Sequence, residues 1–377
     1  MRAVVTDVDV RSSVAAIRGL GRSGIQVVAV GPAGAAGLRS RFASDHIVAP
    51  DAAEDPDGFL AALAAISERW PRLVVYPGKE ESLDVLLGRD VTPEAVLPYP
   101  GRDAVEVLRD KRTVPTLAER AGFKSPRSFH QGPLGALDEG SIEYPCLIKP
   151  LAKGTALGAA RVLGGTADTR KFMSTLPPDE GVLVQERVAG ALEAVSLVLA
   201  PGGRLVARFH QRALATWPAA AGSSRLAVGL EPDDDLVARA AGMLAGAGFW
   251  GLAHVQFLAA VDGPYLIDIN TRYYGSIALA MASGVNLPAI WHAVTVGERL
   301  PARVPPYTSG VTYRWVEGEL LAALHGSPRS ALRRARAPRV GPMWAGDDPW
   351  ASAALASQAL GAWFARRARR LCRGTPR

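Results

Sequence analysis

The stretch that most constrains the fold is a pair of apolar segments joined by a short polar turn. The segments are Leu252 to Ala260 and Tyr265 to Asn270, and Asp262 and Gly263 lie between them. An Asp-Gly pair between two alternating runs predicts a β-hairpin. We therefore expect an antiparallel pair of strands here.

Alternation along this hairpin separates an apolar face from a polar face, because successive strand residues point to opposite sides. The apolar face carries Val255, Phe257, Ile267 and Ile269. The polar face carries Gln256, Asp268 and Asn270. Counting from the turn puts Gln256 opposite Asp268 or one residue away. Carboxylate and amide oxygens suit Mg²⁺, and Arg272 lies just beyond, where a guanidinium could reach a phosphate. On this pattern alone, a polar strand end running into a turn remains open.

Composition indicates an intracellular protein with two or three domains. The chain has 377 residues, 48% of them apolar, and two cysteines, which form no disulfide framework and no zinc spacing. The N-terminus lacks the apolar core of a signal peptide, and no apolar run is long enough to cross a bilayer. We expect a cytoplasmic protein.

The positive charge is confined to the C-terminal segment. Residues 301–377 hold 13 arginines and four acids, while the whole chain has a net charge of +7. The first 300 residues are therefore slightly acidic, and binding to nucleic acid is not expected.

The N-terminal part predicts a parallel α/β unit: a strand over Ala3 to Val8, a helix over Ser13 to Leu20 and a strand over Gln26 to Val30. The stretch from Gly19 to Gly24 matches G-x-G-x-x-G, but it follows the helix and precedes the strand. A dinucleotide fingerprint needs the opposite order, so we predict a helix C-cap and turn.

A second unit places charged residues at a strand end. A helix is expected over Phe59 to Arg69 and a buried strand over Leu73 to Tyr76, which Pro77 and Gly78 end. Ligands of open α/β sheets lie beyond the carboxyl ends of strands. Lys79, Glu80 and Glu81 are therefore candidate substrate contacts, although a solvated helix start explains them equally well.

The middle of the chain carries further cations beside a glycine-rich loop. Lys111 lies in a helical stretch from Asp103 to Ala121, and Lys149 ends the apolar strand of EYPCLIKP. The loop from Leu151 to Val162 contains Lys153, Gly154, Thr155 and Gly158. Glycines let backbone N–H groups approach phosphates. A buried strand from Gly181 to Val188 then turns polar at Gln185, Glu186 and Arg187, and Glu193 opens the next strand.

In their order, these pieces resemble the ATP-grasp superfamily, and most closely its carbamoyl-phosphate-synthetase-like members. The resemblance covers residues 1 to about 300 and rests on DKRTVPTLAERAGFKSPRS, YPCLIKPLAKGTALGAARV, VLVQERVAGALEAVSLVL and HVQF…YLIDINTRYYGSIALAMASGVNLP. It implies an α/β chain with an N-terminal Rossmann-like pre-ATP-grasp domain (1–102), a two-subdomain ATP-grasp fold (103–300) and a basic C-terminal extension (301–377).

The resemblance also implies the site. Lys111 and Lys149 would contact ATP phosphates, the loop from Lys153 to Gly158 would cover them, Leu183 to Val188 would hold adenine, and Glu193 would bind ribose. Gln256, Asp268 and Asn270 match the ligands of one or two Mg²⁺ ions, for which Mn²⁺ would substitute, and Arg272 matches the arginine that stabilises the transferred phosphoryl group. The family usually has Glu where this chain has Asp268, so ion affinity would depend heavily on the ATP phosphates.

The implied reaction is an ATP-dependent ligation in which a carboxylate becomes an acyl phosphate and an amine or a thiol displaces the phosphate. The partners would be small-molecule carboxylates and amines. Arg208, His210 and Arg212 alternate and could face the substrate, or they could form a solvated face. Two alternatives are a carboxyl or carboxyphosphate kinase and an ATP-binding protein without turnover.

The last segment, Pro349 to Cys372, predicts a helix with one apolar face and a basic end containing Arg366, Arg367, Arg369 and Arg370. Such a helix suits an anionic membrane surface or an acidic partner. It suits packing on the main body equally well. A homodimer is also compatible with the sequence.

Overall fold

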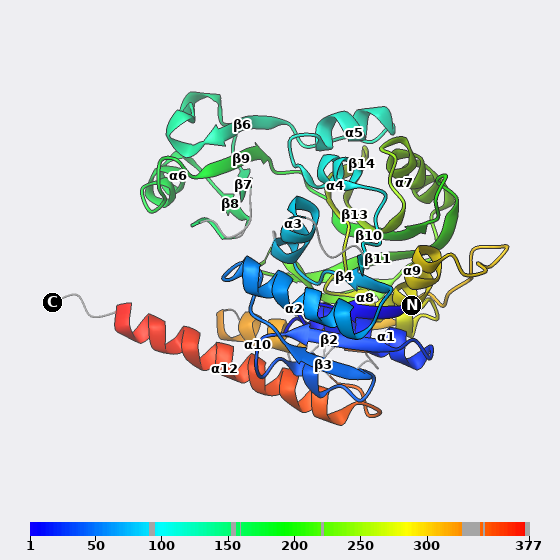
Figure 1. The fold of residues 1–377 in the computed structure, drawn as a ribbon. Coiled ribbons are helices and arrows are strands. Elements are labelled where there is room, and N and C mark those ends of the chain that lie inside the picture. Colours follow the sequence, from blue (N-terminus) through cyan, green and yellow to red (C-terminus); the bar gives the residue numbers. More distant parts are fainter. Residues whose placement is uncertain are drawn as a thin grey trace.

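The computed structural model describes residues 1–89, 95–151, 156–158, 160–219, 222–325, 340–341 and 344–373. Three β-sheets, each with helices packed against it, organise this part of the chain (Figure 1). A parallel sheet comes first, a small antiparallel sheet follows, and a long antiparallel sheet forms the centre. This architecture confirms the α/β fold class expected from the sequence.

The N-terminal sheet is parallel, with helices connecting its strands. Its strands are β1 (Arg2–Val5), β2 (Val27–Gly31), β3 (Asp45–Val48), β4 (Leu73–Tyr76) and β5 (Ala95–Val96). Its helices are α1 (Arg11–Arg22), the 3₁₀ turn η1 (Ala36–Arg39), α2 (Pro56–Arg69) and α3 (Glu80–Gly88). The strand order is β3-β2-β1-β4-β5, so the direction in which the sheet grows reverses between β1 and β4. Ligands of such sheets bind beside this reversal, at the carboxyl ends of the two strands.

The glycines between Gly19 and Gly24 form the end of α1, as predicted. Gly24 has φ +77° and donates its N–H to the carbonyl of Gly21 at 3.0 Å. Inside the helix, Gly19 allows a close approach, because a Cβ there would lie 2.7 Å from the sulfur of Met281. The motif is therefore a C-cap and a packing site.

The small sheet contains the strand that ends in Lys149. Its strands are β6 (Ser128–Pro133), β7 (Cys146–Pro150), β8 (Arg161–Leu163) and β9 (Gly181–Glu186), accompanied by η2 (Leu134–Ala136), η3 (Glu139–Ser141) and α6 (Thr166–Met173). All pairs are antiparallel, in the order β6-β9-β7-β8. Alternation in β7 buries Cys146 and Ile148 and leaves Lys149 half-buried on the other face.

The central sheet contains the hairpin and the first strand of the C-terminal segment. Its strands are β10 (Ala191–Leu199), β11 (Leu205–Trp217), β12 (Ser223–Gly229), β13 (Gly251–Ala260), β14 (Gly263–Asn270) and β15 (Thr312–Arg314). They are antiparallel, in the order β14-β13-β10-β11-β12-β15. The predicted hairpin is confirmed, with Gln256 directly opposite Asp268.

One residue of the hairpin's predicted apolar face is misplaced. The register shifts after Gln256, so that Phe257 faces Leu266 and Ile267 is the extra residue of a β-bulge. Leu266 is fully buried, whereas Ile267 is half-buried. The prediction for Ile267 was wrong because strict alternation cannot anticipate a bulge. Val255, Phe257 and Ile269 are buried as predicted.

Helices cover the central sheet and connect it to the parallel sheet. They are α4 (Arg102–Arg109), α5 (Val114–Arg120), α7 (Asp234–Gly246), α8 (Ile277–Ala282) and α9 (Leu287–Val296). The single helical stretch expected from Asp103 to Ala121 is two helices, with Lys111 in the break between them. Pro115 explains the break, because proline is tolerated only in the first turn of a helix.

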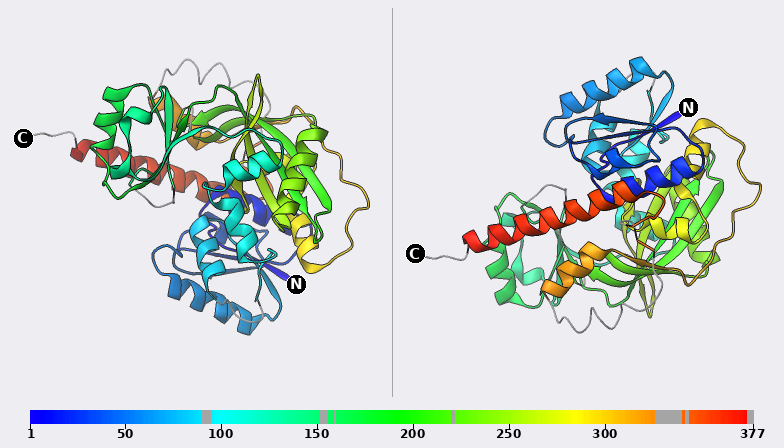
Figure 2. Two further views of the ribbon diagram at one scale, coloured as in Figure 1. Left: turned by 90° about the horizontal axis from the view of Figure 1, so that it is seen from above. Right: turned by 90° about the horizontal axis from the view of Figure 1, so that it is seen from below.

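The C-terminal segment continues through α10 (Val316–His325) to the long helix α12 (Pro349–Arg373). The first turns of α12 lie against the N-terminal part of the chain, and its far end extends beyond the parallel sheet (Figures 1 and 2). Ala351 and Leu355 pack with Val14 of α1 and Ala36 of η1. Packing on the main body is thus confirmed for this half of the helix. The side chains of Arg366 to Arg370 lie outside the described part.

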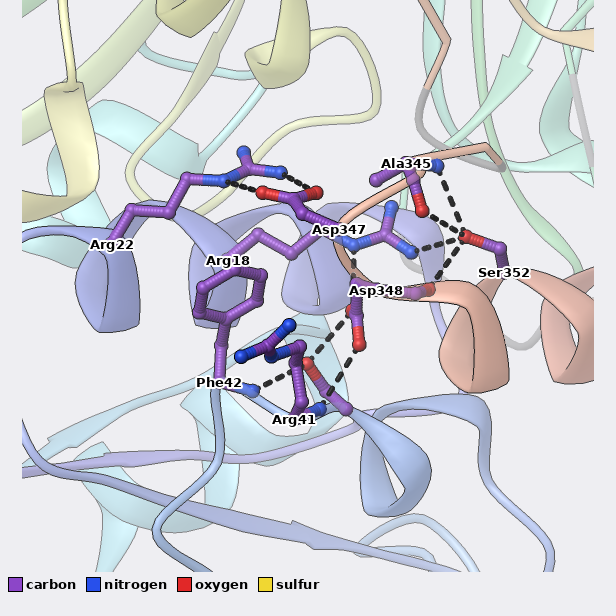
Figure 3. A network of polar contacts seen from close by, with 9 residues as sticks. Arg18, Arg22, Arg41, Phe42, Ala345, Asp347, Asp348 and Ser352 are labelled. Carbon is purple, nitrogen blue, oxygen red and sulfur yellow. Dashed lines mark hydrogen bonds and ion pairs between the residues drawn. The ribbon is translucent and has the colours of Figure 1, made fainter.

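A buried polar network fixes the start of α12 (Figure 3). The Asp348 carboxylate accepts hydrogen bonds from Arg18 Nε at 2.8 Å, from the Ser40 hydroxyl at 2.8 Å and from the Arg41 amide at 3.0 Å. Ser352 accepts another from Arg18 at 3.0 Å. Among the helices described, none has both the length and the apolar character needed to span a membrane.

Candidate active site

The polar face of the hairpin brings together the three predicted metal ligands. Gln256 and Asp268 are cross-strand partners, and Asn270 follows two residues later on the same face. The Asn270 amide donates to Asp268 Oδ2 at 3.0 Å and to Gln256 Oε1 at 3.5 Å. All three side chains are half-buried. The described residues contain no group of three or more His, Cys, Asp or Glu placed to hold a metal, so a cation would rely on one carboxylate and two amides.

These ligands line a cleft of about 540 Å³ between the central sheet and the parallel sheet. The parallel sheet contributes the connections after β1 and β4, the two strands that flank the reversal of strand order. The predicted residues that line the cleft are Lys79, Glu80, Glu81, Gln256, Asp268, Asn270 and Arg272. The cleft therefore lies where open α/β sheets bind their ligands.

Arg272 is held by Glu80, which the sequence suggested as a substrate contact. Arg272 Nε donates to Glu80 Oε1 at 2.7 Å, and Arg109 donates to Glu80 Oε2 at 2.7 Å. Arg272 also donates to the carbonyl of Tyr273 at 2.9 Å. The Glu80 side chain is only 10% exposed. Its two oxygens are thus engaged by arginines, and the geometry makes Glu80 a positioning residue for Arg272.

Lys149 and Lys111 approach Asp268 from the small sheet and from the break between α4 and α5. Lys149 Nζ lies 3.4 Å from the carbonyl of Ile267, in the bulge, and Lys111 donates to the carbonyl of Pro150 at 2.5 Å. Burial lowers the pKa of Lys149 to about 8; Asp268 opposes this shift and Lys111 adds to it. Burial also lowers the pKa of Lys111. Both ammonium groups would gain from a nearby anion.

Most of the glycine-rich loop is outside the described part of the chain. Lys153, Gly154 and Thr155 are among the loop residues that the structure does not describe. Gly158 is described, with φ +68°, and the amide of Leu157 donates to Glu180 at 3.0 Å.

The strand expected to hold adenine is paired on both sides. β9 lies between β6 and β7, so its own backbone offers no free edge over Gly181–Glu186. The Gln185 side chain is buried and reaches Ser128 Oγ at 3.3 Å, and Glu186 accepts from the Arg127 amide at 2.9 Å. The first backbone groups beyond this paired strand are those of Arg187 and Val188.

Glu193 and the three alternating residues of β11 lie on the other face of the central sheet. Glu193 lies opposite Phe257 and Arg212 in the sheet, whereas its neighbour Ala194 lies opposite Gln256. Glu193 therefore points to the face that does not carry Gln256. Its carboxylate accepts from His210 at 3.0 Å and from Arg212 at 2.8 Å. Burial opposes the charge of Glu193, but these two partners lower its pKa. The structure does not bring Arg208, His210 or Arg212 to the cleft, since the register turns them away from it.

Lys79 lines the cleft with its ammonium group already paired. It lies 3.0 Å from Asp9 and 2.7 Å from Asp51. Although burial works against the charged form, the two carboxylates raise the pKa of Lys79. Lys79 therefore adds little net charge to the cleft.

The sequence reasoning missed His254, which also lines the cleft. Its ring stacks on Tyr274 with centroids 3.8 Å apart, and Nδ1 lies 2.9 Å from Ser196 Oγ. Burial lowers the pKa of His254 to about 3, and the charge of Arg272 adds to the effect. The imidazole is thus neutral. His254 is two residues before Gln256 in the same strand, so the two side chains share the polar face. The alternation of the strand alone could therefore have identified it.

A second cavity, of about 640 Å³, lies between α1, α8 and the C-terminal segment. Its lining includes Arg18, Arg22 and Asp347 of the contact that anchors α12. Among the described residues, none of the predicted phosphate or metal contacts lines it.

Part of the chain matches a known family. Residues 182–319 match the sequence model described as "ATP-grasp in the biosynthetic pathway with Ter operon". No curated protein matches the sequence.

Solved structures share the architecture at low sequence identity. N5-carboxyaminoimidazole ribonucleotide synthetase in complex with ADP is 15% identical, with a TM-score of 0.68 over 86% of this chain and 83% of that chain. The biotin carboxylase domain of the 2-oxoglutarate carboxylase from Hydrogenobacter thermophilus, with MgADP and bicarbonate, is 16% identical, with a TM-score of 0.62 over 82% of this chain and 73% of that chain. The L-amino acid ligase from Bacillus licheniformis is 13% identical, with a TM-score of 0.59 over 78% and 74%.

At these identities the likeness concerns the fold, and the carbamoyl-phosphate-synthetase-like subtype stays a prediction. The partial family match and the shared architecture together identify the chain as a protein with the ATP-grasp fold.

Proposed function

We propose that this chain is an ATP- and Mg²⁺-dependent ligase that activates a carboxylate as an acyl phosphate for attack by an amine or a thiol. The observation that carries the proposal is a cleft lined by Asp268 and Arg272, with Lys149 close enough to interact with the Asp268 carboxylate. Phosphoryl transfer asks a protein mainly for positioning and for charge neutralisation at phosphate oxygens. This set of residues supplies both without a protein nucleophile.

The donor set fits Mg²⁺. Asp268, Gln256 and Asn270 present one carboxylate and two amides on one strand face, and magnesium commonly takes one or two protein carboxylates together with substrate phosphates. These residues would hold the ion, and the bound ion would neutralise charge on the phosphate oxygens. Because the protein offers a single carboxylate, we expect ion affinity to rise strongly when ATP is bound. Replacement by Mn²⁺ and a second ion stay predictions.

The basic residues would divide the phosphate contacts. Lys149 and Lys111 stand on the small-sheet side of Asp268, and each carries a pKa lowered by burial. A phosphate would restore the charged form that burial disfavours. Arg272, oriented by Glu80, would face the phosphoryl group in transfer. Adenine would bind at the backbone of Arg187 and Val188.

The solved structures of the same fold support this class of reaction. They include an L-amino acid ligase and two enzymes captured with ADP or with MgADP and bicarbonate. Bicarbonate in one of them keeps a carboxyphosphate-forming kinase step as the second candidate. The distinction is measurable, because a kinase would release ADP without an amine.

The test follows ADP and phosphate release from Mg·ATP against a panel of carboxylic acids, amino acids and dipeptides. Arg272→Ala is the loss-of-function variant, and Arg102→Ala, which removes an exposed surface ion pair with Glu106, is the matched control. Release that needs both a carboxylate and an amine or thiol, and that is lost only in Arg272→Ala, supports the ligase. Release with bicarbonate or a carboxylate alone supports the kinase. Tight ATP binding with no release from a broad panel contradicts both.

The other interactions expected from the sequence remain predictions. A homodimer is one, and contact of the basic C-terminal helix with an acidic partner or an anionic membrane is another.

A further inference from the structure

Arg11 is a positively charged residue of the cleft, and the proposed reaction gives it no role. It is the first residue of α1, just beyond the carboxyl end of β1, and it lines the cleft with Lys79 and Arg272. Its position is therefore at the reversal of strand order, where ligands of open α/β sheets bind.

Two segments far along the chain hold the Arg11 side chain. Arg11 Nε donates to the carbonyl of Gly275 at 3.3 Å, and the guanidinium carbon lies 3.9 Å from the centre of the Trp315 ring. Tyr313 donates its hydroxyl to the same Gly275 carbonyl at 2.9 Å. A planar guanidinium that is stacked and hydrogen-bonded has lost much of its rotational freedom. Arg11 is thus oriented in advance of any ligand.

Gly275 is needed for this arrangement. A Cβ at that position would lie 2.4 Å from Arg11 Nη2. The absence of a side chain allows the end of the guanidinium to reach the cleft beside the backbone.

Arg11 differs from the other cations that line the cleft in the neighbours that the described residues give it. Lys79 is paired with Asp9 and Asp51, and Arg272 is paired with Glu80. Within the described ranges, Arg11 has no carboxylate partner, and its polar neighbours are the Gly275 carbonyl and the Tyr313 hydroxyl. Neutral oxygens do not cancel a full charge, so a half-buried guanidinium in a cleft is a ready partner for an oxyanion.

We propose that Arg11 binds an oxyanion of the substrate, a carboxylate or a phosphate, that is separate from the carboxylate receiving the phosphoryl group. The inference rests on the proposed function, since that function defines the reacting group. Trp315 acts as a positioning residue for Arg11. The substrate class is then a small molecule with a second anionic group: an α-amino acid as nucleophile, or a dicarboxylic or phosphorylated acid.

Different residues would bind this oxyanion and the reacting one. The reacting carboxylate must meet the phosphate between Asp268 and Arg272. Arg11 lies against Gly275, three residues beyond Arg272, which is up to about 10 Å of extended chain. Asn270, Arg272, Tyr274 and Gly275 all line the cleft, so one molecule can span both ends.

Calorimetric binding to the protein loaded with Mg·ADP tests the proposal without requiring turnover. Each panel compound is paired with a neutral analogue: amino acids and dicarboxylic acids with their amides, and phosphate monoesters with their parent alcohols. A charge-assisted hydrogen bond contributes about 1.5–3 kcal/mol, and 1.4 kcal/mol is tenfold. Wild type should therefore prefer one class of acid to its neutral analogue by about 10- to 100-fold.

The variants separate recognition from structure. Arg11→Met should bind the acid and its analogue equally, Arg11→Lys should recover part of the preference, and Trp315→Leu should weaken it. ADP affinity and Tm should stay near those of wild type, as they should in the control Arg102→Met. A preference that survives in Arg11→Met, or a wild type that binds no panel acid, overturns the proposal. Failure of the proposed function looks different: the preference is present, but no ADP is released.

Discussion

Replacing Asp348 by alanine should loosen the docked half of α12, whereas the same change at the neighbouring Asp347 should leave it in place. The two positions are a matched pair on one turn. Asp348 and Arg18 have side chains that are 1% and 4% exposed, whereas Asp347 and Arg22 are 48% and 41% exposed. Burial is therefore the variable that distinguishes the two ion pairs.

The expected magnitudes follow from that burial. Removing one partner of a buried ion pair costs about 3–5 kcal/mol, because a charge is left in a poorly solvated place. Asp348→Ala also removes the acceptor of the Ser40 hydroxyl and the Arg41 amide. An exposed pair contributes about 0–1 kcal/mol. The opening equilibrium of α12 should rise by about 10²- to 10⁴-fold in Asp348→Ala and by less than about tenfold in Asp347→Ala.

Native-state hydrogen exchange measures this local opening directly. The relevant amides are those of residues 351–361, in the half of α12 that packs on α1 and η1. A global unfolding curve is less informative, because a chain of this size with three sheets need not unfold in two states. Equal protection of these amides in both variants, or unchanged protection in Asp348→Ala, would refute the reasoning.

Four further predictions concern the cleft and the lysine beside it. Glu80→Gln keeps the shape of the residue that orients Arg272 but removes its charge, so kcat for ADP release should fall by about 10- to 100-fold with little change in the KM for ATP; an unchanged kcat would contradict the positioning role. Because burial lowers the pKa of Lys149 to about 8, the charged form that binds phosphate is lost as pH rises through that value, so ATP affinity should weaken above pH 8 in wild type and not in Lys149→Met. The same shift affects stability, because between about pH 8 and the lysine pKa of about 10.4 in the unfolded chain, residue 149 holds a proton in the unfolded state and not in the folded state. Lys149 should therefore increase the free energy of unfolding as pH rises through that window. This contribution to the pH dependence should be absent in Lys149→Met. Gly275→Ala places a Cβ 2.4 Å from Arg11 Nη2, so it should weaken binding of the second oxyanion by about tenfold with Tm nearly unchanged; a large loss of Tm with normal binding would oppose it.

The metal-binding face could be predicted because it depends on local rules. The turn sequence and the alternation of side chains along each strand bring Gln256 opposite Asp268, and both depend only on residues within one hairpin. The same alternation reveals His254. It misleads at Ile267, because a bulge depends on how the sheet twists against its neighbours and not on the order of apolar residues.

The rest of the site depends on contacts between distant residues, which no local pattern contains. Glu80 orients Arg272 across 192 residues, and Gly275 holds Arg11 across 264. The sequence made Glu80 and Lys79 equal candidates for substrate binding, because it does not show that arginines engage Glu80 or that aspartates engage Lys79. Arg208, His210 and Arg212 show a related limit: alternation shows that they share a face, but only the register with β10 shows which one.

The bond between Arg18 and Asp348 joins residues 330 positions apart, and this separation has a consequence for synthesis of the chain. The parallel sheet and α1 can assemble as soon as they are made, because domains generally fold as units from the N-terminus during translation. Until Asp348 is made, its bond with Arg18 cannot form, and the apolar patch of Val14 and Ala36 lacks its cover. The nascent chain thus exposes this polar and apolar surface through most of its translation, and α12 covers it last.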